Sequence, residues 1–261
     1  MKKFFTMASI LALALTACSK DGAVNEAEGN GRVNVSCVAM TEVSTTRANV
    51  SCTTPSAEDF TLSIVGVDSD FAAEYAKIAQ FNENNYLHHG NYVATVVAGD
   101  LAEEGYDKAT FVGNKQFAVA ARQSTDVEIT ATIANALVVV KTTENFANYF
   151  AGGYALELTT AAGNKFDVTA QSAPLFIAPG VFTVSGTAVK QPNQSGSEGV
   201  EVTLPEYKNE AAQAQTLYTV KFDVENAGSA TLNITLNDTL VESIDIEQEL
   251  NDNAQLKRSI V

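Results

Sequence analysis

Alternation of apolar and polar residues over short runs is the feature that most constrains the fold of this chain. Apolar side chains alternate with threonine, serine or charged residues in segments 60–64, 127–133 and 218–224. A period of two places the apolar side chains on one face of a strand and the polar ones on the other. The sequence therefore predicts an all-β fold of antiparallel sheets, each with one buried and one wet face.

Helical spacing is confined to two short segments. Phe71, Tyr75 and Ile78 recur at helical spacing in DFAAEYAKIAQF, and ENFANYFAGG places Phe146 beside Phe150 before a glycine pair that suits a helix stop. We predict two short helical connectors. Their aromatic side chains are expected to cover the core of a sandwich rather than line a ligand site.

An internal repeat sets the predicted number of domains. LHHGNYVATV matches IAPGVFTVSG, with Gly90 at the position of Gly180, and in each copy an alternating run, FTLSIV or YALELT, lies upstream. The matched glycine supplies a positive φ at the turn before a strand. The repeat predicts two tandem antiparallel β-sandwich domains, residues 32–135 and 136–261.

The amino terminus predicts export and a lipid anchor. Lys2 and Lys3 precede a short uncharged apolar run, which has the length and charge of a secretory signal and is too short to remain as a membrane-spanning helix. LTAC, ending at Cys18, resembles a bacterial lipobox, which implies cleavage before Cys18 and a lipid on its sulfur. We predict a signal peptide over 1–17 and a flexible tether over 18–31. The alternative is a buried Cys18 beside an ordinary signal.

A known family resembles this order of motifs. The lipobox, DFTLSIVG, HHGNYVATV and FIAPGVFTVSGTA together are similar to a Bacteroides-type surface lipoprotein family that carries a domain of unknown function. That family is distantly similar to fimbrillin subunits and anchors. The resemblance implies transthyretin-like or immunoglobulin-like sandwiches, lipid anchoring at the outer membrane and a role in adhesion or pilus-like assembly. It also implies surface or pilus-like subunits or host ligands as partners, and it brings no active site.

The segment behind Cys18 bears on which side of the membrane the protein faces. Ser19, Lys20 and Asp21 resemble the short export tag of such surface lipoproteins. The tag favours a position on the cell surface.

Residues that could carry catalysis or bind a metal are sparse. His88 and His89 are adjacent, so on an extended chain they point to opposite faces and cannot readily share a metal. No nucleophile elbow, P-loop or HExxH motif is present, and the acidic segments lack EF-hand spacing. The sequence predicts no enzyme, no metal and no cofactor.

Charge and aromatic content restrict the partners. The formal net charge is −15, and clusters of Lys and Arg are what neutralise phosphates, so we exclude nucleic acid. The chain has no tryptophan, the ring best suited to stacking on sugars, although eight tyrosines remain. We therefore favour adhesion or assembly. A glycan-binding lipoprotein of a polysaccharide-uptake system is the alternative.

Cys37 and Cys52 form a candidate disulfide. They occupy matching NVSC segments, and a hairpin closed at Ser44 and Thr45 would place them opposite each other. Opposed strand residues lie near disulfide distance, and an exported protein permits the bond. The alternative is two small buried thiols.

Two further residues are candidate modification sites. The NDTL segment reads as a turn, and Asp238, Thr239 and Leu240 also resemble an O-glycosylation acceptor motif at Thr239. Arg47 lies in the polar segment STTRANV, and fimbrillin-like subunits are trimmed after such an arginine. We favour retention of Arg47 and of the lipid, and so a monomeric anchored protein with its first strand in place, because exposed arginines are common in loops.

Overall fold

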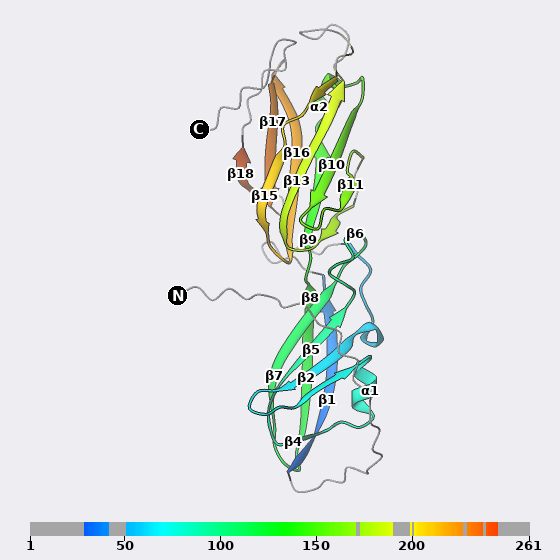
Figure 1. Cartoon of the computed structure of the whole chain (residues 1–261), viewed down its shortest axis with the longest axis vertical. Coiled ribbons are helices and arrows are strands. Elements are labelled where there is room, and N and C mark those ends of the chain that lie inside the picture. Colours follow the sequence, from blue (N-terminus) through cyan, green and yellow to red (C-terminus); the bar gives the residue numbers. More distant parts are fainter. Residues whose placement is uncertain are drawn as a thin grey trace.

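The computed structural model describes residues 29–41, 51–170, 173–189, 199, 201–226, 229–236 and 239–244, with side chains as far as Asp223. Strands make up most of this part of the chain, and the fold is all-β. Figure 1 shows two packed halves arranged end to end, which we call the N-terminal lobe (29–134) and the C-terminal lobe (135–244). The division into two domains at residue 135 stays a prediction.

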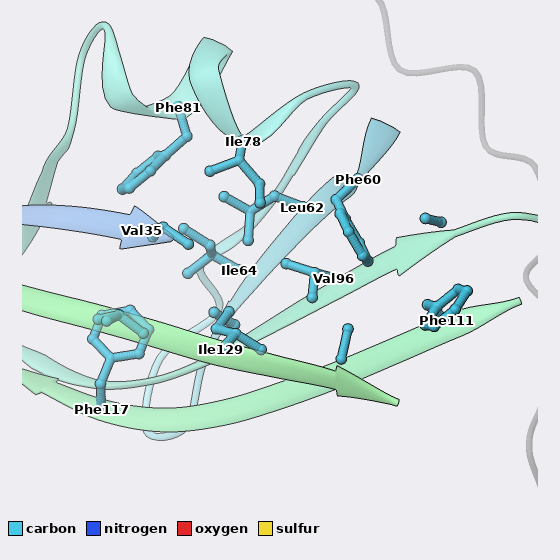
Figure 2. Packing of buried hydrophobic residues seen from close by; sticks show 14 of the residues in the cluster. Val35, Phe60, Leu62, Ile64, Ile78, Phe81, Val96, Phe111, Phe117 and Ile129 are labelled. Atoms are coloured by element: carbon cyan, nitrogen blue, oxygen red, sulfur yellow. The ribbon is translucent and has the colours of Figure 1, made fainter. Parts of the chain in front are cut away.

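The N-terminal lobe is built on one seven-stranded sheet. Its order is β3 (Ala72–Tyr75), β2 (Thr61–Gly66), β5 (Gly90–Ala98), β7 (Phe111–Val119), β8 (Ser124–Ile133), β1 (Asn30–Met40) and β4 (Tyr86–His88). All neighbours are antiparallel except β1 and β8, which are parallel. Val35 on β1 and Ile64 on β2 lie in the same core although their strands are far apart in the order, so the sheet closes over itself (Figure 2).

The C-terminal lobe has two sheets. In the first, β11 (Lys165–Asp167), β10 (Tyr154–Thr160) and β13 (Gly180–Val189) are adjacent, and β14 (Glu201–Thr203) and β15 (Tyr207–Ala212) both pair with β13. The second has the order β18 (Thr239–Ile244), β17 (Ser229–Leu236), β16 (Thr216–Asn226), β9 (Ala136–Thr142), β12 (Leu175–Ile177) and β6 (Gly105–Tyr106). Here β9 and β16 are the parallel pair. The strand β6 comes from the N-terminal half of the chain.

The two lobes repeat the same pairing around the matched glycines. Gly90 (φ 156°) opens β5 and Gly180 (φ 150°) opens β13. In the N-terminal lobe Ile64 lies opposite Ala94, and in the C-terminal lobe Leu158 lies opposite Val184. These are the positions that the sequence repeat aligns, because FTLSIV and YALELT each pair with the strand that follows a matched glycine.

One of the two expected helices is wrong over half of its length. Ala72–Tyr75 form β3, antiparallel to β2, and only Ile78–Asn82 (α1) is helical. The ring of Tyr75 packs 5.3 Å from that of Phe81. Pairing with β3 satisfies backbone groups along the edge of β2 that a helix at this position would have left unpaired, so tertiary contacts override the local helical spacing.

The second expected helix is confirmed as α2 (Glu144–Tyr149). The hydroxyl of Thr143 caps it by accepting a hydrogen bond from the N–H of Phe146 (3.1 Å). The rings of Phe146 and Phe150 lie 4.8 Å apart, and both are fully buried in the C-terminal core. These aromatics cover a sandwich core, as the sequence suggested.

The start of the fold corrects the predicted tether. The strand β1 begins at Asn30, so the last two residues assigned to the tether, 30 and 31, are already in the sheet. The N–H of Arg32 donates to the carbonyl of Gln123 (2.8 Å), which shows why the chain is held here. Cys18, the signal peptide and tether residues 19–28 lie outside the described residues.

Candidate functional site

Polar and backbone hydrogen bonds converge at the joint between the lobes, which is our candidate site in the described part of the chain. The connection from β5 to β7 leaves the N-terminal lobe and adds β6 to a sheet of the C-terminal lobe, where Gly105 pairs with Phe176 and Tyr106 with Leu175. Gly105 is buried and has a φ of 151°, a conformation that glycine adopts without strain. The backbone of one lobe is therefore part of a sheet of the other.

Glu104, next to this strand, binds three groups of the C-terminal lobe. Its Oε2 accepts hydrogen bonds from the Thr160 hydroxyl (2.6 Å) and the Asn164 side-chain amide (2.7 Å), and its Oε1 accepts one from the N–H of Ala178 (2.9 Å). Hydrogen bonds to an ionised carboxylate are about twice as strong as neutral ones. Sequence analysis missed Glu104, because an acidic residue in a loop carries no pattern that distinguishes a clamp from a solvated charge.

Apolar side chains also cross the joint. Leu137 on β9 and Phe176 on β12 belong to the core of the N-terminal lobe, whereas their neighbours Ala136, Val138 and Ile177 belong to the core of the C-terminal lobe. Successive side chains of a strand point to opposite faces. These two strands therefore serve both cores.

Asn135 lies at the centre of the joint and is completely buried. Its Oδ1 accepts the N–H of Thr110 (2.6 Å), and its backbone carbonyl accepts the N–H of Gln215 (2.8 Å). Its Nδ2 and the Thr110 hydroxyl have no hydrogen-bond partner among the described residues. Such an orphaned group costs about 1–3 kcal/mol, so the joint is held in spite of a local penalty.

An open cleft lies beside the joint. It is lined by Ala102, Glu103, Glu104, Lys108, Asn164, Lys165 and Phe166. Lys108 is 3.0 Å from Glu103, and Lys165 is 2.7 Å from Glu157. Because these charges already have partners, the cleft offers a ligand mainly the half-buried ring of Phe166 and the outer faces of paired polar groups.

His88 is the last residue of β4, and His89 lies between β4 and β5. The chain bends at His89, so the two side chains do not point to opposite faces as they would on an extended strand. Their rings are 4.1 Å apart, Nδ1 of His88 is 3.2 Å from the His89 carbonyl, and Nδ1 of His89 is 3.3 Å from the Gly29 carbonyl. Within the described ranges, no three His, Cys, Asp or Glu residues lie close enough together to hold a metal ion.

The structure does not pair Cys37 with Cys52. Both are free thiols, half-buried against the N-terminal core. Cys37 on β1 lies opposite Ile129 of β8, and Cys52 belongs to no strand, so the hairpin expected to oppose them is not formed. β1 instead takes its partners from much later in the chain.

Leu236 at the end of β17 lies opposite Thr239 at the start of β18, whereas residues 237 and 238 of the predicted turn lie outside the described residues. Glycosylation of Thr239 stays a prediction. Arg47 lies outside the described residues, so its processing is also untested.

A family model described as "Domain of unknown function (DUF4493)" matches residues 29–252. No curated protein matches the chain. In the residues that the structure describes, no helix is both long enough and apolar enough to cross a membrane.

Several solved structures are similar over most of their length. A fimbrial assembly protein from Parabacteroides distasonis is 12% identical, with 80% of this chain and 100% of that chain covered and a TM-score of 0.42. A provisionally assigned adhesin from Bacteroides thetaiotaomicron is 14% identical, with 83% and 80% covered and a TM-score of 0.34. Superpositions at this level carry no argument about the function of this chain.

Proposed function

This chain belongs to the DUF4493 family, and we propose that it is a lipid-anchored protein of the outer-membrane surface with an adhesive or fimbria-like structural role. In this proposal it catalyses no reaction. Its lipid is attached at Cys18, and its partners are other surface or pilus-like subunits or host ligands.

The end-to-end arrangement of the lobes carries the proposal. The strand β1 begins at the end of the N-terminal lobe that lies away from the C-terminal lobe (Figure 1). A tether of about a dozen residues reaches only about 20 Å. A chain anchored through Cys18 would therefore hold the N-terminal lobe beside the membrane and project the C-terminal lobe outward. The three hydrogen bonds of Glu104 and the pairing of β6 with β12 would limit movement between the two lobes.

The position of β1 favours an anchored monomer over a subunit trimmed for polymerisation. It pairs with β8 from Arg32 to Met40 and with β4 from Asn30 to Arg32. A sheet that lost this strand would expose unpaired backbone groups and need a strand from another molecule. With β1 in place, the N-terminal lobe has no such need.

The proposal is tested first at Cys18. Cys18→Ser should release the protein from membranes or leave it unprocessed, and intact mass of the wild-type protein should show the lipid. Cells that lack the protein should then adhere less to host surfaces, and the wild-type gene should restore adhesion while Cys18→Ser should not. Normal processing and membrane retention of Cys18→Ser would refute the anchor. A surface form that begins at Ala48 and runs as detergent-resistant ladders would instead indicate a polymerising subunit.

A glycan-binding lipoprotein is the second candidate because of the cleft beside the joint. A half-buried aromatic ring among amides and charges, as at Phe166 and Asn164, is a recognised platform for sugars. The paired state of Lys108 and Lys165 weighs against it. Saturable binding on a glycan array that is lost in Phe166→Ala would favour this candidate over adhesion through protein partners.

A further inference from the structure

One end of the N-terminal lobe differs in charge from the rest of the molecule. The chain enters this end at Gly29, and two arginines flank the entry. The N–H of Arg122 donates to the carbonyl of Asn30 (2.7 Å), and the N–H of Arg32 donates to the carbonyl of Gln123 (2.8 Å). We call residues 29–32, 86–89 and 120–123 the entry end. Its backbone hydrogen bonds fix both arginines at the point where the predicted tether arrives.

The two arginines are distinctive in a chain of net charge −15. They are the only arginines whose side chains the structure describes, both are exposed, and neither has an ion pair with another described residue. Three of the described lysines, Lys108, Lys165 and Lys208, in contrast each lie within 3.0 Å of a glutamate oxygen. The positive charge of the entry end is therefore available to another molecule.

Carboxylates close to the entry end are bound to amides instead. Asp126 accepts a hydrogen bond from the side chain of Asn34 (2.8 Å), and Asp68 accepts one from the side chain of Asn91 (3.3 Å). These contacts direct both carboxylates to neutral donors. They lower the attraction of the arginines less than ion pairs would.

The guanidinium groups of Arg32 and Arg122 are both exposed to solvent at the entry end. The Cζ of Arg32 lies 5.5 Å from the centre of the half-buried Tyr86 ring on β4, a cation–π arrangement that restricts the position of the exposed guanidinium group. Arg122 has a φ of 61° in the turn between β7 and β8. A guanidinium group binds phosphate oxygens through two parallel hydrogen bonds and sheds water more readily than an ammonium.

We propose that the entry end docks on the headgroup phosphates of anionic lipids in the leaflet that holds the anchor, through Arg32 and Arg122. The proposal rests on the lipid anchor for its geometry, because the predicted tether confines this end to within about 20 Å of the membrane. Contact at a second point would orient the molecule with its C-terminal lobe away from the membrane. The acidic remainder of the surface, repelled by the same phosphates, would act in the same direction.

The test supplies the tether chemically, so it does not depend on lipidation. The mature chain, with a hexahistidine tag in place of Cys18, is bound to vesicles that contain a nickel-chelating lipid in either phosphatidylcholine or a phosphatidylcholine–phosphatidylglycerol mixture. The Arg32→Gln, Arg122→Asn double variant removes both charges, and asparagine tolerates the positive φ at position 122. The charge-matched control is Lys141→Gln with Lys208→Gln in the C-terminal lobe.

On anionic vesicles the arginine variant should bind up to about 30-fold more weakly than the parent, since each basic residue near an anionic surface contributes about fivefold. The control should bind like the parent, and all three should bind neutral vesicles equally. Equal losses in the two double variants, or no loss in either, would overturn the proposal. Displacement by inorganic phosphate, but not by chloride at the same ionic strength, would assign a free-phosphate site instead.

A measurement on the parent alone guards against misfolding of the arginine variant. Rising salt should weaken the parent's binding to anionic vesicles and leave its binding to neutral vesicles unchanged. A parent that binds both vesicles equally at every salt concentration would contradict docking. If Cys18 carries no lipid in the native host, the proposed function fails while these vesicle results still stand on their own.

Discussion

The two lobes share one pairing plan but close it differently. In each, the first strand of the lobe is parallel to a late one, β1 with β8 and β9 with β16. In the N-terminal lobe β7 then pairs with β8 at Phe111–Ile133 and Val112–Thr132, so one sheet runs through the lobe. In the C-terminal lobe β16 takes β17 as its neighbour, and no ladder joins it to β15 among the described residues.

The cores differ in a way that matches this difference in closure. Aromatic rings pack on one another in both cores, as Tyr92 and Phe117 do at 5.7 Å in the N-terminal lobe, but the C-terminal core has the larger set. There Phe146 packs 5.1 Å from Tyr154 and 5.8 Å from Phe222, and Phe182 packs 5.8 Å from Tyr218. Large side chains bridge the space between two separate sheets. In the N-terminal lobe one continuous sheet surrounds the core, so hydrogen bonds between strands join its two sides. A single repeat can therefore be stabilised by side chains or by sheet continuity.

Removing an aromatic ring that only the C-terminal lobe has is the strongest test of the difference between the two cores. Phe146 on α2 is fully buried and has no counterpart in the N-terminal lobe. Phe146→Ala should destabilise the C-terminal lobe by about 3–5 kcal/mol, through lost burial and the cavity left behind. Hydrogen exchange should then accelerate in β10 and β16 while β5 and β7 keep their protection. Equal acceleration in both lobes would show that the lobes do not differ in the way described.

The reciprocal change tests closure by strands. A Cβ on Gly113 of β7 would lie 2.5 Å from the Thr130 carbonyl oxygen and 2.9 Å from the Cα of Ala131, so β7 and β8 could not stay as close. Gly113→Ala should cost about 1–3 kcal/mol and act on the N-terminal lobe. Chemical denaturation followed by exchange should show the loss in β7 and β8. Gly163→Ala is a control for added bulk alone: its Cβ meets no atom, although its φ of 84° strains any other residue. Its effect should be confined to the turn between β10 and β11.

The coupling between lobes depends on Glu104. Glu104→Ala leaves the Thr160 hydroxyl, the Asn164 amide and the Ala178 N–H without their acceptor, at a net cost of about 1–2 kcal/mol. The change should split a single calorimetric transition into two. Glu103→Ala, which removes only an exposed ion pair with Lys108, should cost less than about 1 kcal/mol and leave one transition. Two transitions in the wild-type protein would refute the coupling.

The smallest effect distinguishes the two thiols of the N-terminal lobe. Burial raises the pKa of Cys37 and of Cys52, and the Asp107 carboxylate raises the pKa of Cys52 further. Both should alkylate slowly at neutral pH and faster as pH rises. Asp107→Asn should speed alkylation of Cys52 and leave that of Cys37 unchanged, by mass spectrometry of labelled peptides. No change at Cys52 would exclude the charge as a cause.

The same shifts set the sign of a small pH dependence. A thiol whose pKa is raised by folding contributes stability that is fully present below its ordinary pKa. That contribution is lost as pH rises through the raised value, because the unfolded chain releases its proton first. Alkaline denaturation midpoints of Cys37→Ser and Cys52→Ser should therefore vary less with pH than those of the wild-type protein.

Local signals in the sequence were enough for the strands and the repeat. Alternation located β2, β8 and β10, and Gly90 and Gly180 marked the same turn in both lobes, because side-chain period and glycine conformation act over a few residues. The parallel contact of β1 with β8 joins residues some ninety positions apart and depends on the whole lobe. The mistaken helix at β3 has the same origin, since its pairing with β2 is tertiary.

The contacts at the joint could not be predicted from the sequence, for a different reason. Glu104 functions only because two donors of the β10–β11 hairpin and one from the segment between β12 and β13 converge on it, and no spacing along the chain encodes that convergence. The repeat alone suggested a boundary near Asn135, and that boundary stays a prediction. The buried amide of Asn135 and its contacts with Thr110 and Gln215 could be seen only in three dimensions.

The parallel pairing of β1 with β8 also determines when the N-terminal lobe can fold during synthesis. β1 leaves the ribosome before its partner, which is made about ninety residues later, and Phe176 of the N-terminal core is made later still. Contacts between such distant segments form slowly, because the chain loses the entropy of closing a long loop before the contacts stabilise it. During synthesis the first strand therefore stays unpaired until the rest of its lobe has been made. Lipid attachment near the amino terminus would hold that waiting strand at the membrane, away from other nascent chains, until its own lobe can close.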